Sequence, residues 1–191
     1  MKNKLGLVLL LISICHIGAA KNTISGNLQM QTERDTSETK DLPLLFKLPN
    51  NEWNTVIHKS PGVFIFKRNP ISDSAGRHII PAIMIYTEDA AAYKQDIAIF
   101  TSKKMQPFLD RGVKVPKIIN WQNKDYPLTF KNALFMQGTY SDNNVDHIIF
   151  MTYIIDKNDN GIQVYMDMTK EVATKYIAEF WTTVWSLKEK P

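Results

Sequence analysis

The stretch from Val145 to Leu187 constrains the fold of this 191-residue chain more than any other part of its sequence. Its apolar residues recur with a period of two up to Met168 and with a period near 3.6 from Thr169 onward, which predicts two strands followed by a helix. The first strand is apolar on both faces, with Ile148, Phe150, Thr152 and Ile154 on one and Ile149, Met151, Tyr153 and Ile155 on the other. A strand without a polar face needs cover on both sides, so we expect it near the middle of a sheet with a layer on each side.

The helix is predicted to begin after Thr169 as N-cap, with Glu171 in its first turn. We interpret its apolar stripe as core, because packing of such a stripe is what stabilises most helices. A ligand pocket and a membrane-surface helix are the alternatives, and the second would need a polar face rich in Lys and Arg. The stripe consists of Val172, Tyr176, Ile177, Phe180, Trp181, Val184 and Trp185, and the polar face of Glu171, Lys175, Glu179, Thr182 and Ser186.

Residues 1–20 have the pattern of a signal peptide, with Lys2 and Lys4, an apolar run over 5–17 and small residues at 18–20. The apolar run is too short for a membrane span, which needs about 20 residues. We therefore predict export to the periplasm or the medium. Anchoring as a lipoprotein through Cys15 is disfavoured, because Ile14 stands where a small residue is normal.

Cleavage after residue 20 would leave 171 residues without cysteine, which excludes disulfide and thiol chemistry. Loss of Lys2 and Lys4 leaves 21 of the 23 Lys and Arg residues against 19 acidic residues, a net charge of +2. This charge is too small to indicate nucleic acid or an anionic membrane as partner, and we expect no stable membrane insertion after signal cleavage. Residues 21–41 are polar and predicted to form a flexible leader, and residues 42–191 a single α+β domain.

Other parts of the domain predict further strands and a second helix. We expect a hairpin over 55–68, a loop over 69–76, a strand over 78–86 interrupted at Pro81, a helix over 89–105 capped by Asp89 and stopped by Pro107, and strands over 114–121 and 128–140. A turn over 141–144 leads into the central strand. The sum is a mostly antiparallel sheet of about six or seven strands with helices on both faces, an αβα sandwich.

This pattern resembles the PsbP/Mog1-like fold, which includes exported bacterial PsbP-like and DcrB-like proteins. The resemblance spans roughly residues 42–187. It is carried by Phe46-Lys47-Leu48-Pro49 with Trp53, the strand over 78–86 with the helix after it, and the ending Ile177-Ala178-Glu179-Phe180-Trp181. It implies a non-catalytic binding or assembly factor, and it supplies no shared set of catalytic residues.

One motif has the outline of a calcium loop. Asp156-Lys157-Asn158-Asp159-Asn160-Gly161 has Asp167 at the twelfth position, but Gln163 stands at the usually apolar eighth position. In an extended chain Asp167 would lie about 20 Å from the loop. We therefore interpret the motif as a hairpin turn, and weak calcium binding by the turn alone remains an alternative.

No residue pattern indicates an enzyme, a cofactor or a metal. His58, His78 and His147 lack metal-ligand spacing. The segment Ser72-Asp73-Ser74 near His78 invites comparison with a hydrolase triad, yet it lacks a nucleophile elbow. A phosphate-binding glycine loop is also missing from the sequence.

The densest basic group gives the candidate binding residues, which are Trp53, Lys67, Arg68, Arg77 and His78. They could bind an unknown protein or a small anionic ligand, because Arg makes directional contacts with carboxylates and phosphates. A solvated strand edge is the alternative interpretation. We therefore predict an exported, non-enzymatic binding or accessory protein, with a helix-grip carrier of an apolar molecule or an exported hydrolase as alternatives.

Overall fold

The computed structural model describes residues 41–56, 60–126 and 128–190. Its main sheet has seven strands in the order β2-β3-β6-β10-β9-β8-β7, and all neighbours are antiparallel. The strands are β2 (Trp53–Val56), β3 (Val63–Arg68), β6 (Ala82–Asp89), β7 (Lys114–Asn120), β8 (Ala133–Asp142), β9 (Val145–Ile155) and β10 (Asn160–Thr169). The predicted α+β class and strand number are confirmed. The predicted signal peptide, Cys15, His58 and nearly all of the leader lie outside the described residues.

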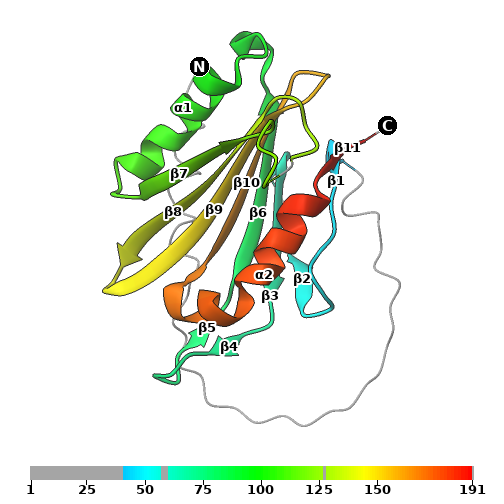
Figure 1. Ribbon diagram of the computed structural model, residues 1–191. Coiled ribbons are helices and arrows are strands. Elements are labelled where there is room, and N and C mark those ends of the chain that lie inside the picture. Colours follow the sequence, from blue (N-terminus) through cyan, green and yellow to red (C-terminus); the bar gives the residue numbers. More distant parts are fainter. Residues whose placement is uncertain (1–40, 57–59, 127, 191) are drawn as a thin grey trace.

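Two small ribbons and two α-helices complete the described part of the chain. The ribbons pair β1 (Leu44–Leu45) with β11 (Lys188–Glu189), and β4 (Ile71–Ser72) with β5 (His78–Ile79). The helices are α1 (Ile97–Leu109) and α2 (Lys170–Ser186), and a short 3-10 turn, η4 (Ala91–Tyr93), precedes α1. Figure 1 shows the β4–β5 ribbon near the start of α2 and the β1–β11 ribbon at its end.

Strand β9, next to the middle strand β10, is buried on both faces from Ile149 to Ile155. Phe150 and Ile154 belong to one core cluster together with Phe180 of α2. Ile149 and Tyr153 belong to a second cluster, which contains Phe100 of α1. The prediction that neither flank of this strand is open to solvent is confirmed, since successive side chains point to opposite faces of a strand.

The hairpin between β8 and β9 is tighter than expected. Asp142 pairs with Val145, so the turn contains only Asn143 and Asn144, with φ of 48° and 62°. Two left-handed residues form the turn whose twist matches that of the flanking strands, and Asn tolerates this conformation.

The predicted helix over 89–105 is wrong at both ends. Asp89 ends β6, and the cap of α1 is Asp96, whose side chain accepts from the N–H of Ile99. Lys94 and Gln95, with φ of 51° and 61°, separate η4 from α1, so one continuous helix is not formed. Pro107 lies inside the last turn, which continues to Leu109.

Pro81 divides the predicted strand over 78–86. Residues on its N-terminal side form β5, and those on its C-terminal side form β6 in the main sheet. The carbonyl of Pro81 accepts from the N–H of Arg68 at 3.0 Å. The predicted loop over 69–76 contains β4, and β8 begins at Ala133 rather than at 128.

Candidate binding surface

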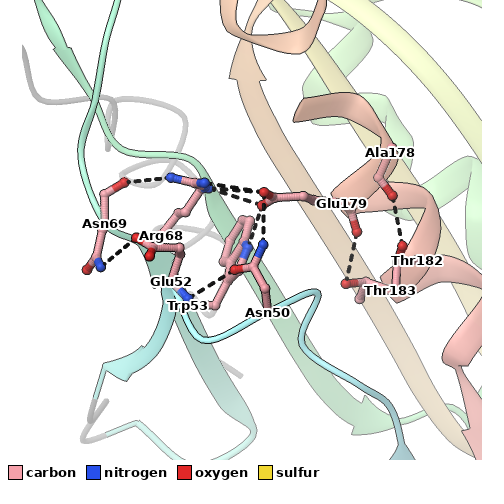
Figure 2. Close-up of polar contacts among 9 residues, drawn as sticks. All are labelled: Asn50, Glu52, Trp53, Arg68, Asn69, Ala178, Glu179, Thr182 and Thr183. Carbon is pink, nitrogen blue, oxygen red and sulfur yellow. Dashed lines mark hydrogen bonds and ion pairs between the residues drawn. The ribbon is translucent and has the colours of Figure 1, made fainter. Parts of the chain in front are cut away.

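Glu179 of α2 is the centre of a polar network that joins this helix to β2 and β3 (Figure 2). Its carboxylate accepts from Nε1 of Trp53 at 2.7 Å, from Nδ2 of Asn50 at 3.0 Å, and from Nε and Nη2 of Arg68 at 3.1 and 3.3 Å. The side chains of Arg68 and Glu179 are only 11% and 15% exposed. Hydrogen bonds between oppositely charged groups are among the stronger ones in proteins.

The pairing of β2 with β3 builds this network. It places Trp53 directly opposite Arg68, so both side chains lie on the same face. The guanidinium of Arg68 also lies 4.6 Å from the ring centroid of Tyr176, one turn before Glu179 on α2.

The predicted polar face of α2 is therefore not open to solvent along its whole length, because Glu179 is largely covered. The chain segment before β2 runs along this face, where the N–H of Lys47 donates to Ser186 Oγ at 2.8 Å. Thr183 Oγ1 donates to the carbonyl of Lys47 at 3.3 Å. A helix side without apolar residues can still be covered by chain, provided that its polar groups find partners.

Trp53 and Arg68 thus come together, but their polar atoms contact Glu179 of the same chain. Lys67, the next predicted residue, is half-buried and lies opposite Asn54 and Ala82 in neighbouring strands. A ligand would therefore have to compete with Glu179 for Arg68.

Arg77 and His78 lie in the β4–β5 ribbon. Arg77 Nε donates to Asp73 Oδ2 at 2.6 Å, while Asp73 Oδ1 accepts from the N–H groups of Ala75 and Arg77. Burial alone would raise the pKa of Asp73, but the hydrogen bonds and the charge of Arg77 hold this pKa below its ordinary value. The Arg77 side chain is 34% exposed, and His78 is exposed.

The segment Ser72-Asp73-Ser74, which suggested a hydrolase triad, connects this ribbon to α2 through hydrogen bonds. Ser74 donates to the carboxylate of Glu171 through its N–H at 2.6 Å and through its hydroxyl at 3.1 Å. Ser72 stands opposite His78 in the ribbon, and Asp73 is paired with Arg77. The side chains of Ser74 and Asp73 therefore bond Glu171 and Arg77 instead of forming one hydrogen-bonded chain with His78.

The turn that suggested a calcium loop also has internal partners. Asp156 accepts from the N–H groups of Asn158 and Asn160 at 2.8 Å and from Nδ2 of Asn160 at 2.7 Å. Asp167, far along β10, accepts from Tyr140 Oη at 3.0 Å. Throughout the described ranges, groups of three or more His, Cys, Asp or Glu side chains that could hold a metal ion are absent.

Sequence reasoning missed a stack of aromatic rings at the end of α2. Trp181 stacks on Trp185 with centroids 5.3 Å apart and on Tyr126 with centroids 5.4 Å apart. The ammonium of Lys117 lies 4.3 Å from the Tyr126 ring centroid. Trp185 is 49% exposed, so the interpretation of the whole stripe as core is wrong at this residue. Its place in the last turn of the helix was the available signal.

The chain matches no family model and no curated protein. PA94 of Pseudomonas aeruginosa, a protein of unknown function, has a similar solved structure, with TM-score 0.52 and 12% identity over 73% of this chain and 99% of that one. LpqN of Mycobacterium tuberculosis, involved in cell envelope biogenesis, has TM-score 0.54 and 12% identity over 78% and 84%. At this identity the likeness concerns the fold alone. Among the helices of the described residues, none is long and apolar enough to cross a membrane.

Proposed function

We propose that this protein is an exported, non-catalytic binding or accessory protein whose β4–β5 ribbon contacts an acidic partner. The observation that carries the proposal is the difference between the polar side chains of this ribbon that bond within the chain and those that remain exposed. Ser74 and Asp73, which could take part in hydrolysis, bond to Glu171 and Arg77 and fix the ribbon. Arg77 and His78 keep exposed surface.

The chemistry of Arg77 supports an anionic ligand. Its ion pair with Asp73 is formed through Nε, which is one of five N–H donors of a guanidinium in a planar fork. The remaining donors, on Nη1 and Nη2, suit a carboxylate or phosphate. The neighbouring His78 would add a hydrogen-bond donor.

We further infer a three-layer αβα architecture of the PsbP/Mog1 type. It is supported by the division of β9 between one core cluster that includes α2 and another that includes α1. Export is supported by the pattern of residues 1–20 and fits a fold that a cell envelope protein shares.

A comparison of the parent protein with two variants tests the proposal. The exported protein, isolated from cells that express the full chain, is immobilised and exposed to the envelope fraction of those cells. We expect an acidic component to be retained and to be released by salt, because exposed charge pairs are screened. Arg77→Gln combined with His78→Ala should reduce retention, because the guanidinium that suits an anionic group is then lost, whereas Lys103→Ala on α1 should not.

Two results would contradict the proposal. One is retention that the double variant leaves unchanged. The other is turnover of generic esters or peptides that Ser74→Ala abolishes, which would indicate a hydrolase.

A further inference from the structure

Strand β7 forms one end of the main sheet, opposite to β2 in the strand order, and within the described residues it pairs only with β8. Its outer edge therefore presents backbone groups that another strand can bond. Free edges are usually protected by short length, charged side chains, proline or bulges.

The first half of β7 has such protection. Its pairing with β8 is irregular between Lys114 and Lys117, and Pro116 lies in this irregular part. A proline has no N–H to offer to an added strand. The second half, from Lys117 to Asn120, pairs regularly with β8 and contains no proline.

Lys117 gives this second half little protection. Its ammonium lies over the ring of Tyr126, 4.3 Å from the centroid, and is thereby drawn toward the aromatic stack. Next to it Ile118 is 58% exposed, the highest value among the large exposed apolar side chains of the described residues. Trp121, just beyond the strand, is 39% exposed.

We propose that β7 pairs with β7 of a second copy of this chain, antiparallel and centred on Ile118. In this register Ile118 faces its own counterpart and Lys117 faces Ile119, so the lysines do not face each other. Apolar and β-branched pairs across strands are favourable, whereas like charges directly opposite are not. The contact is isologous, as in most homodimers.

The size of the contact sets the expected strength. Four or five residues on each side bury less than the roughly 1,200 Å² of a standard interface, so the dimer should be weak and depend on concentration. The inference does not rest on the proposed function, because the β4–β5 ribbon is not part of β7.

Sedimentation velocity of the exported protein over a wide concentration range tests the association. We expect a monomer that converts to a dimer as concentration rises. Ile118→Lys should weaken the dimer at least about tenfold in Kd, since the two introduced lysines would then face each other directly at the centre. Ile99→Lys, at a residue of α1 that is 49% exposed, is the matched control and should leave the Kd unchanged.

Cysteine trapping tests the register. Cys15 is the only cysteine and precedes the predicted cleavage site, so Ile118→Cys supplies a single thiol to the exported chain. Opposed residues of antiparallel strands have Cα atoms about 4.5–5.5 Å apart, within the range that a disulfide spans. Mild oxidation should crosslink Ile118→Cys and leave Ile99→Cys monomeric.

Several results would overturn the proposal. They are a monomer at every concentration, a dimer that Ile118→Lys leaves intact, and equal crosslinking at the two positions. Should Ile118→Lys fail to give the circular dichroism spectrum of the parent, Ile118→Thr at the same position is measured in its place. A monomeric chain that binds a strand of another protein at β7 would also overturn it.

Discussion

Replacing Glu179 by Ala should remove one of the strongest polar connections between α2 and the first strands. The carboxylate accepts from Trp53, Asn50 and Arg68 and is only 15% exposed. Removing one partner of a buried ion pair costs about 3–5 kcal/mol, because the other charge stays buried. Arg68 keeps 11% exposure and its contact with Tyr176, so we expect the lower end, about 3 kcal/mol.

Urea unfolding followed by tryptophan fluorescence measures this loss, and a second glutamate on the same helix provides the control. Glu171 is exposed and its carboxylate bonds Ser74, so Glu171→Ala should cost about 1 kcal/mol. Arg68→Met with Glu179→Leu should recover part of the loss, since apolar replacement of both charges avoids their desolvation but does not restore the bonds from Trp53 and Asn50 to Glu179. Equal losses for the two glutamates would refute the reasoning.

Four further predictions concern single sites. Phe180→Ala, at a fully buried ring, should lower the free energy of unfolding by about 3–5 kcal/mol in urea. Gly161→Ala should lower it by about 1–3 kcal/mol, because the new Cβ would lie 2.8 Å from ring carbons of Phe100. Asp156→Ala should lower the free energy of unfolding by about 1–3 kcal/mol, because N–H groups of the turn lose their acceptor. Calorimetric titration of the parent with millimolar calcium should give no heat of binding. Burial raises the pKa of Tyr86 from 10.0 to about 12. Its neutral form therefore stabilises the fold below pH 10, and this contribution is lost as pH rises through about 12. The alkaline decline in the free energy of unfolding should be shallower in Tyr86→Phe.

The sheet could be predicted from the sequence because its signals are local. The two apolar faces of β9 and the change of period at Thr169 are properties of adjacent residues, and the helix N-cap at Thr169 is confirmed by its bond from the N–H of Val172. The start of α1 could not be found in this way. Asp89 and Asp96 are both acceptable caps, and the left-handed backbone at Gln95 that decides between them depends on long-range contacts. Gln95 donates to the carbonyl of Asp156, 61 residues away.

The candidate site shows the same division between local and distant partners. Arg77 and Asp73 are four residues apart, so their pairing could have been anticipated from spacing. The partner of Arg68 is 111 residues away. In the sequence Glu179 belongs to the same polar side of α2 as the exposed Glu171, so the pattern does not distinguish the two glutamates.

Periodicity gives the direction of a side chain around its helix, but the rest of the chain decides whether that direction meets water. Residues 47–53 cover one end of the polar side of α2 and bring Trp53 to Glu179. A cluster of basic residues in the sequence is therefore a weak guide to a binding site until their acidic partners in the same chain are known. By that criterion Arg68 is occupied by Glu179, and the exposed His78 beside the partly exposed Arg77 is the part of the predicted surface that a ligand can reach without breaking a buried ion pair.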